Sequence, residues 1–310
     1  MYNEDLKRKF IDECIENKSN ANRALRLFSI SEAFENEWGV DICAASEEQL
    51  ALALEKMTGA KLGTQAVDMS TLRKYSKWCC ENKVEGANEN LQEFREISYE
   101  KLRETMIESP EKLQEYLDAV FPPIIDCRPD NLCRGYFWLA YMGFEEKELP
   151  EICSQNVDLK NSAIRFNGKN YQIYDDAIPA IRYLVSANSF IYDYVRYESV
   201  VERDQGSQLL RGMRSGSGVN TESIGRLASH RLKKITDERN ERIVLRYKSI
   251  RYSGIFYKML EEERRTGSID PGWYLKFYFG NTDQLHARRA ARKAVELQTD
   301  YQRWKVAFNK

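Results

Sequence analysis

The side chains that carry most enzyme chemistry are scarce in this 310-residue chain. Its two histidines, His230 and His286, both lie in stretches rich in Lys and Arg. Its seven cysteines show no Cys-x-x-Cys spacing, the pattern typical of a zinc site. Neither a metal cluster nor a Ser/His/Asp triad therefore has the groups that it needs. We expect no metal and no cofactor.

A glycine-rich segment, Arg211–Gly218, is a second place to look for chemistry, because backbone amides in such loops can cradle phosphates. It lacks the Gly-Lys-Ser/Thr ending of a P-loop. We interpret it instead as a flexible basic loop that becomes ordered on nucleic acid through Arg211 and Arg214.

Charge is distributed unevenly along the chain. The formal net charge is −1, yet residues 201–310 hold 23 Lys and Arg against 13 Asp and Glu, a net charge of +10. Clustered Lys and Arg gain free energy by releasing counterions from phosphate backbones, so this basic third predicts a polyanion as partner. The alternative interpretation of these charges is that they form ordinary solvated faces of helices.

Three expected helices carry the basic residues that could contact DNA. In Thr221–Ile235 the basic residues are spaced three and four apart, so they share neighbouring faces that can lie along a groove. They are Arg226, His230, Lys233 and Lys234. The last helix adds Arg288, Arg289, Arg292 and Lys293, and the helix at Thr64–Lys83 adds Arg73, Lys74 and Lys77.

The elements that position these residues are mostly helical. Apolar residues recur with the period of a helix over Asn20–Trp38 and again over Thr64–Lys83, where Val67 and Leu72 belong to the apolar side. Ser46, followed by acidic residues, is a typical helix start. A further helix is expected at Ser98–Ile107.

The composition changes at Glu108-Ser-Pro, where proline suits the first turn of a new helix. We therefore divide the chain into domains at 1–107 and 108–310. In the second, Asn131–Met142 is a very apolar helix. Asn167-Gly168, between two strand-like segments, predicts a β-hairpin over 163–174, the one sheet that the sequence predicts with good signals. Later helices are expected at about 176–186, 221–235, 253–265, 270–279 and 282–307.

The sequence contains no apolar run of the roughly 18 residues that a membrane span needs. The first residues are not followed by the apolar stretch that a signal peptide has, so we expect none. An odd number of cysteines with an adjacent pair, Cys79-Cys80, argues against a disulfide framework. We expect a soluble, cytoplasmic protein with no membrane partner.

Four helices followed by a mostly helical domain with one hairpin resemble the core-binding and catalytic domains of tyrosine recombinases, the phage integrase family. Thr71–Trp78 resembles the third core-binding helix, and Ser109–Ile152 the opening of the catalytic domain. Ala140–Leu149 and Lys248–Gly254 resemble the two arginine boxes. The resemblance covers most of the chain. It implies a mainly α, two-domain architecture, with a small antiparallel β-hairpin in an α-rich catalytic-like domain.

The family's catalytic groups are largely unmatched. Glu145 stands where the first box usually has the arginine that contacts the scissile phosphate, and a carboxylate repels phosphate. Arg251 of the second box is kept, with Lys248 nearby, and Lys169 matches the hairpin lysine. Asn281 replaces a histidine. The position of the nucleophilic tyrosine, near 290 and 291, holds two alanines, so no covalent step is expected.

These patterns predict a sequence-specific double-stranded DNA-binding protein on a catalytically inactive tyrosine-recombinase scaffold. It is similar to the lytic-cycle repressors of some temperate phages of Gram-positive bacteria, which implies a transcriptional regulator of a prophage or mobile element. A second copy of the chain and a regulatory protein or peptide stay open as further partners. The predicted DNA-binding residues are Arg73, Lys74, Lys77, Lys169, Arg211, Arg214, Arg226, Lys233, Lys234, Lys248, Arg251, Arg288, Arg289 and Arg292.

Two alternatives remain. A divergent but active recombinase would use Tyr278 or Tyr301 as nucleophile, with Arg251 and Lys169 at the phosphate. A helical interaction module without DNA function would instead bind an acidic protein through its basic face.

Overall fold

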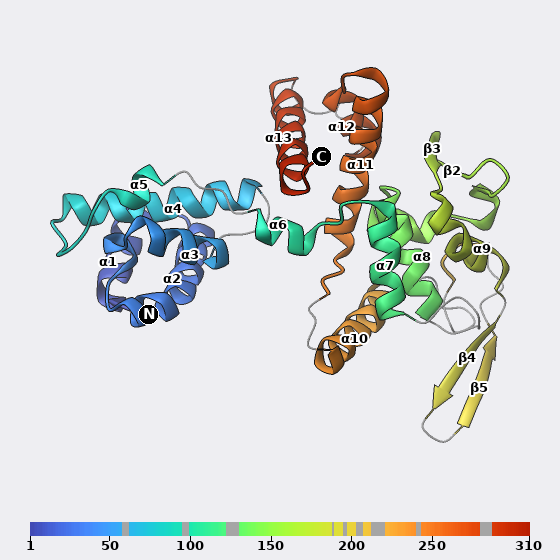
Figure 1. Cartoon of the computed structure of the whole chain (residues 1–310), viewed down its shortest axis with the longest axis horizontal. Helices are drawn as coiled ribbons and strands as arrows, with labels where there is room; N and C mark the ends of the chain where they lie inside the picture. Colours follow the sequence, from blue (N-terminus) through green and yellow to red (C-terminus); the bar gives the residue numbers. More distant parts are fainter. Residues whose placement is uncertain are drawn as a thin grey trace. The chain divides into compact units, whose positions relative to one another are not determined.

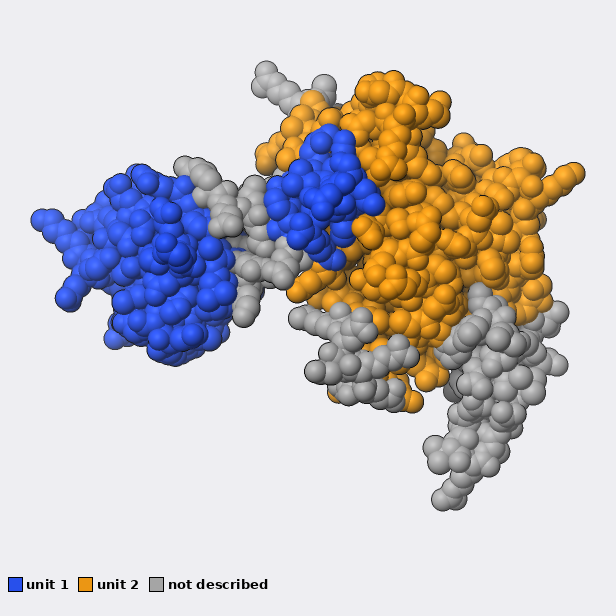
Figure 2. Space-filling model, viewed as in Figure 1, with its two compact units in different colours: residues 1–103, 302–310 blue, residues 104–301 orange. Residues whose placement is uncertain are grey.

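The computed structural model (Figure 1) describes residues 1–57, 62–94, 99–121, 130–187, 189–194, 197–202, 207–211, 221–239, 243–279 and 287–310. The chain divides into two compact units: residues 1–103 with 302–310 form unit 1, and residues 104–301 form unit 2 (Figure 2). The composition change at residue 108 thus lies a few residues beyond the division after Arg103. The last nine residues group with unit 1.

Unit 1 is a helical bundle with an aromatic core. The rings of Phe10, Phe28 and Tyr75 meet edge to face with centroids 4.8–6.2 Å apart, an arrangement that stabilises beyond the area it buries. The elements of this bundle are α1 (Glu4–Cys14), α2 (Lys18–Trp38), a 3-10 helix η1 (Ile42–Ala44), α3 (Glu47–Met57), α4 (Leu62–Glu81) and α5 (Asn90–Glu93).

Local sequence accounts for the starts of these helices. The Asn17 side chain accepts a hydrogen bond from the Ser19 amide at the start of α2. At the start of α3, Ser46 Oγ accepts from the Gln49 amide and Gln49 Oε1 accepts from the Ser46 amide, so the predicted cap is confirmed. Val67 departs from the prediction: it lies on α4 with 41% of its surface exposed, not on the buried side.

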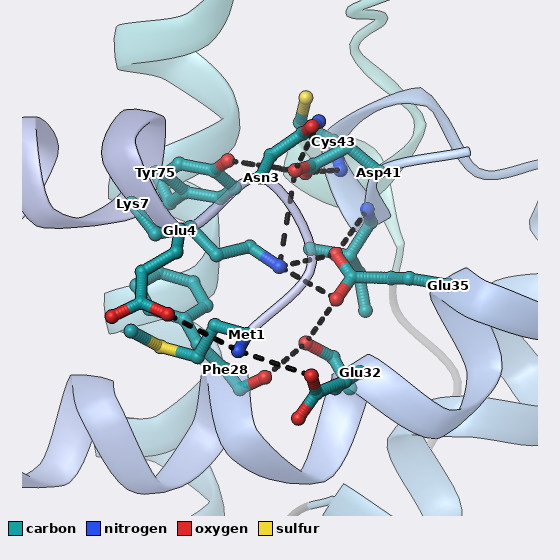
Figure 3. Close-up of polar contacts among 12 residues, drawn as sticks. Met1, Asn3, Glu4, Lys7, Phe28, Glu32, Glu35, Asp41, Cys43 and Tyr75 are labelled. Atoms are coloured by element: carbon teal, nitrogen blue, oxygen red, sulfur yellow. Dashed lines mark hydrogen bonds and ion pairs between the residues drawn. The ribbon is translucent and has the colours of Figure 1, made fainter. Parts of the chain in front are cut away.

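A buried ion cluster joins α1 to α2 and η1 (Figure 3). The Lys7 ammonium donates to both Glu35 carboxylate oxygens at 2.6 Å and lies 3.8 Å from Asp41. The Tyr75 hydroxyl donates to Asp41, and the Ile42 amide donates to Glu35. Burial raises the pKa of Glu35, an effect that Lys7 opposes. Because each charge has partners, the cluster holds these segments in one arrangement.

Unit 2 is mainly helical, with two small sheets. Its elements include α7 (Pro110–Val120), α8 (Asp130–Tyr141), α9 (Ile178–Ser186), α10 (Thr221–Arg239), α11 (Tyr247–Thr266) and α12 (Pro271–Phe279). The short 3-10 helices are η2 (Glu146–Glu151), η3 (Ser154–Asn156) and η4 (Asp175–Ala177). Two helices cross the division between the units, α6 (Glu100–Thr105) and α13 (Ala287–Ala307).

The centre of unit 2 is α8, all twelve of whose residues are buried. Two neighbouring helices approach it closely where glycine leaves room. A Cβ built on Gly254 of α11 would lie 1.7 Å from the Tyr141 carbonyl oxygen, and one on Gly135 would lie 2.5 Å from Leu184 of α9. The apolar run predicted at Asn131–Met142 is therefore the buried core helix, and glycines set how near α9 and α11 can come.

The predicted hairpin is confirmed. Strands β1 (Val157–Asp158), β2 (Ala163–Phe166) and β3 (Lys169–Gln172) form an antiparallel sheet in that order. Phe166 pairs with Lys169 across a turn in which Asn167 and Gly168 have φ angles of 49° and 71°. Both angles are positive, as a tight turn between twisted strands requires.

A second antiparallel pair, β4 (Ser189–Tyr194) and β5 (Tyr197–Glu202), was not predicted from the sequence. The strands are rich in aromatic and β-branched residues, which favour sheets. They escaped prediction because Val195-Arg196 between them is not a typical turn dipeptide.

The later helices also differ from the predicted spans. Helix α11 begins at Tyr247, several residues before the expected start at 253, so that Arg251 lies within the helix. Helix α10 extends to Arg239. None of the described helices combines the length and the apolar composition that a membrane span requires.

Substituting Gly254→Ala should destabilise unit 2 by about 3 kcal/mol or more, since the new methyl group would collide with the Tyr141 carbonyl. The measurement is the free energy of unfolding in urea. Gly225→Ala in α10 is the matched control: the nearest atom to its Cβ would be 3.9 Å away, and alanine favours helix. Equal unfolding free energies for the two variants would contradict this account of α8–α11 packing.

Candidate nucleic-acid interface

Arg251 bonds two segments that are distant from it in sequence, residues 143–145 and the end of α12. Its Nε donates to the Gly143 carbonyl oxygen at 2.8 Å, and one terminal nitrogen donates to the Tyr278 carbonyl oxygen. The same nitrogen lies 3.4 Å from a Glu145 carboxylate oxygen. The side chain is only 8% exposed. The turn after α8, the start of η2 and the end of α12 are thus all bonded to one guanidinium on α11.

The guanidinium of Arg251, which the sequence predicts to contact phosphate, is engaged within unit 2. A guanidinium offers five N–H donors in a planar fork, and here the fork faces backbone carbonyls and a carboxylate within unit 2. Its cation also lies 4.7 Å from the ring centroid of Phe279. Arg251 is therefore a structural residue in this conformation.

Glu145 lies between two cations. One carboxylate oxygen faces Arg251, and the other lies 2.7 Å from the Lys147 ammonium. Glu145 also takes part in a capping box with Glu148, whose side chain accepts from the Glu145 amide at 2.6 Å. The side chain is 25% exposed and Lys147 is 81% exposed. Glu145 and Arg251, which the sequence analysis singled out separately, thus pair with each other.

The two tyrosines considered as nucleophiles are both buried. Burial raises the pKa of the Tyr278 hydroxyl, and its ring lies so near Gly143 that a Cβ there would be 2.3 Å from it. Burial and a hydrogen bond to Glu263, 2.6 Å long, raise the pKa of Tyr301. A raised pKa disfavours the phenolate that would attack phosphorus.

Helix α10 has one buried side and one basic side. Ile224 and Ala228 are buried, and Arg231 donates two 2.9 Å hydrogen bonds to the buried Asp130 of α8. The residues three and four apart on the other side are exposed, and they are Arg226, His230, Lys233 and Lys234. We call these four residues the α10 basic face. Within this face, Arg226 forms a 3.8 Å ion pair with Glu222, which is also exposed.

The other predicted contacts in unit 2 have mixed surroundings. Lys248 is exposed in the first turn of α11. Lys169 is half-buried, with its ammonium 5.5 Å from the ring centroid of Phe277. Arg292 is exposed and pairs with Glu296 at 3.0 Å. Arg214 lies outside the described residues, as do Asn281 and the side chains of Arg288 and Arg289.

Arg211 does not lie in an open loop, contrary to the sequence-based interpretation. It is buried, and its guanidinium donates to the carbonyl oxygens of Val185 and Ala187 at the end of α9. These carbonyls lie at the C-terminal end of α9, where no following helical turn supplies an N–H donor. A cation is therefore favourable there.

In unit 1, one of the three predicted cations is also engaged internally. Arg73 is half-buried and donates to the Phe94 carbonyl oxygen at 2.8 Å. Lys74 and Lys77 are exposed, as predicted, and Lys77 lies 3.8 Å from Glu81.

Sequence reasoning missed two features. Arg231 was not singled out, although its ion pair with Asp130 orients α10; the signal would have been its place among Ile224 and Ala228 on the inner side. Trp273, 49% exposed, stacks on Phe277 at 4.9 Å. The i, i+4 spacing of these two aromatic residues in an expected helix could have indicated that stack.

A known protein family matches most of unit 1. Residues 1–81 match the family model described as MrpR, N-terminal core-binding domain. The expected core-binding domain is thereby confirmed for these residues. No curated protein matches the sequence.

Solved structures of recombinases and integrases resemble the chain in outline. The Tn1549 transposon integrase, solved in complex with a circular intermediate DNA, matches with 12% identity and a TM-score of 0.38 over 94% of this chain and 98% of its own. XerA recombinase matches with 12% identity and a TM-score of 0.38, over 94% and 97%. The integrase from mycobacterium phage Brujita matches with 11% identity and a TM-score of 0.32, over 96% and 90%.

Replacing Arg251→Lys should lower the free energy of unfolding by about 2–4 kcal/mol, because an ammonium cannot reproduce the planar fork and leaves buried carbonyls poorly bonded. Urea unfolding followed by circular dichroism measures this. The control, Lys248→Ala, changes an exposed cation one turn earlier in the same helix and should leave the curve unchanged. Loss of stability confined to the control would contradict the structural role of Arg251.

Proposed function

We propose that this protein binds double-stranded DNA in a sequence-specific manner without recombining it, and that it regulates transcription from a prophage or mobile element. The observation that carries the DNA-binding part is the α10 basic face. It comprises three exposed basic residues and a histidine opposite the side that anchors the helix to α8. The match of residues 1–81 to a core-binding domain supports the same function for unit 1.

The dimensions of α10 suit a groove. Its 19 residues span about 28 Å at the rise of an α-helix, and the major groove of B-DNA admits one helix. Arg226 and Lys233 are two turns apart, so both can reach phosphates or base edges along one strand. Asp130 and Arg231 fix the helix from behind, which limits the entropy lost when DNA binds.

A second observation favours binding without strand cleavage. An active tyrosine recombinase, the family that this chain resembles, places cations against the scissile phosphate and brings a tyrosine hydroxyl to it. Here Arg251 pairs with Glu145, and the hydroxyls of Tyr278 and Tyr301 are buried with raised pKa values. A phosphate at Arg251 would meet the Glu145 carboxylate, which repels it. The phenolate of either buried tyrosine would be costly to form.

Affinity selection tests sequence preference directly. The full-length protein is mixed with fragmented host DNA in about 150 mM salt, and the retained fragments are sequenced. Fragments that share one motif upstream of genes would support a regulator. Recovery of one DNA locus at the boundary of a mobile element would favour the active recombinase. Absence of any enriched fragment would favour binding to an acidic protein instead.

The double variant Arg226→Ala, Lys233→Ala should bind its duplex about 10- to 30-fold more weakly at 150 mM salt. The slope of log affinity against log salt should fall by about 2, as expected for two lost phosphate contacts. Fluorescence anisotropy with a labelled duplex measures both. The matched control is Arg264→Ala, Arg265→Ala, which removes two exposed arginines from the end of α11 and should leave the slope unchanged. Equal weakening in both double variants would remove α10 from the interface.

A denaturing gel with a nicked duplex should show no covalent protein–DNA band, and Tyr278→Phe should bind the duplex like the parent because its hydroxyl is buried. A covalent band in the parent that Tyr278→Phe or Tyr301→Phe abolishes would establish the divergent recombinase instead. Thermal melting of each variant controls for loss of folding.

A further inference from the structure

Unit 2 is strongly acidic where α7, η4 and the second half of α11 come together. Helix α7 packs against η4. Burial raises the pKa of Asp176 in η4, and three neighbouring carboxylates raise it further, those of Glu111, Asp175 and Asp118. Glu111 also acts on Glu261 of α11, whose pKa is raised mainly by burial. All of these side chains are exposed, and we call them the acidic face: Glu111, Asp118, Asp175, Asp176 and Glu261.

The cations near the acidic face balance only part of its charge. Three of them are in ion pairs, which are Arg134 with Asp118 at 2.7 Å, Lys112 with Glu115 at 2.7 Å, and Lys258 with Glu261 at 3.9 Å. Arg264 also acts on Glu261, and Glu108 acts on Lys112. With Glu108 and Glu115 included, carboxylates still outnumber cations. Among the described residues, no ion pair engages Glu111, Asp175 or Asp176.

Two tyrosine hydroxyls lie buried close to these carboxylates. They belong to Tyr141 of α8 and to Tyr174, which directly precedes η4, and in the described part of the chain neither has a hydrogen-bond partner. Burial raises the pKa of both hydroxyls, and the Glu261 carboxylate adds to each rise. Buried polar groups are usually hydrogen-bonded. Each hydroxyl oxygen is therefore available to accept from an N–H donor.

The rings that carry these hydroxyls suit a cation. The centroids of Tyr141 and Tyr174 are 5.4 Å apart, and half-buried Tyr257 of α11 lies 6.4 and 6.1 Å from them. The Lys258 ammonium is 4.9 Å from the Tyr174 centroid, so the chain already places one cation on this cluster. Glu111 and Glu261 both act on Tyr257. An aromatic ring near carboxylates attracts ammonium and guanidinium groups.

The extent of the acidic face favours a row of cations over a single ion. Glu111 and Asp118 are two turns apart on α7, which is about 10 Å at the rise of an α-helix. Among the described residues, no three His, Cys, Asp or Glu side chains are grouped so that they could hold a metal ion. A guanidinium has five N–H donors in one plane, so a single arginine can bond a carboxylate and a hydroxyl together.

We propose that the acidic face is the docking site for an arginine-rich segment of a basic protein partner, with one arginine against Tyr257 between Glu111 and Glu261. The remaining arginines of the segment pair with Asp175 and Asp176. Because the carboxylates repel phosphate, DNA is excluded from this face. The inference therefore does not depend on the proposed DNA binding.

The test uses a tetra-arginine peptide as the probe and the full-length protein. Isothermal titration in about 50 mM salt, where surface charges are weakly screened, should show binding by the parent. The double variant Glu111→Gln, Asp176→Asn should bind about 5- to 10-fold more weakly, because two exposed charge pairs are lost. Thermal melting of each variant establishes that it is folded.

Two matched controls separate this face from charge in general. Glu85→Gln, Glu89→Gln removes the same charge from exposed positions of unit 1 and should bind like the parent. Tyr257→Leu should weaken binding about 2- to 5-fold, whereas Tyr257→Phe keeps the ring and should not. These single variants keep the test valid if the double variant folds poorly. Equal weakening by both double variants, or equal binding by Tyr257→Leu and Tyr257→Phe, would overturn the proposal, as would a parent that does not bind the peptide.

Two further measurements test the identity of the occupant. Spermidine at the peptide's concentration should not displace it, since a flexible polyamine lacks the planar fork of arginine; full displacement would assign the face to a small polycation instead. Analytical ultracentrifugation should give the same oligomeric state for the parent and for Glu111→Gln, Asp176→Asn. Self-association of the parent that this double variant abolishes would assign the face to a second copy of the chain and overturn the proposed partner.

Discussion

The hydrogen bonds of Arg251 are the interaction on which unit 2 depends. One side chain on α11 bonds the carbonyl of the turn after α8, the carbonyl of Tyr278 in α12, and the carboxylate of Glu145 before η2. Without Arg251 the buried carbonyls of Gly143 and Tyr278 would lose this donor, at a cost of about 1–3 kcal/mol per lost bond. The planar fork of arginine can serve all three, which no other side chain can.

The same contacts determine what this place can do chemically. Donors that face Gly143, Tyr278 and Glu145 are not turned toward a phosphate, so the interior of unit 2 is used for stability. The cations available to a polyanion lie elsewhere, on the outer side of α10 and at exposed positions such as Lys74, Lys77 and Lys248. The exposed cations and the bonds of Arg251 thus lie on different elements, and a change in one need not alter the other.

Both units use charges inside the protein to hold segments together. In unit 1, Lys7, Glu35 and Asp41 are buried with Tyr75 at their edge, and in unit 2, Asp130 holds Arg231. Such pairs contribute little net stability compared with an apolar replacement of the same shape. They do penalise any arrangement that leaves one charge alone, and so they favour a single packing of α1 on α2 and of α10 on α8.

The sequence alone determined the features that depend on neighbouring residues. Helical periodicity placed α2 and α4, the apolar run Asn131–Met142 placed α8, and Asn167-Gly168 placed the β2–β3 turn, because turn and helix preferences act over a few residues. It also singled out Glu145 and Arg251. Only the tertiary structure decided that these two residues pair and that Arg211 and Arg73 bond carbonyls. The local sequence around a charged residue does not show whether its side chain faces solvent or an acceptor a hundred residues away. Only folding brings that acceptor within hydrogen-bonding distance.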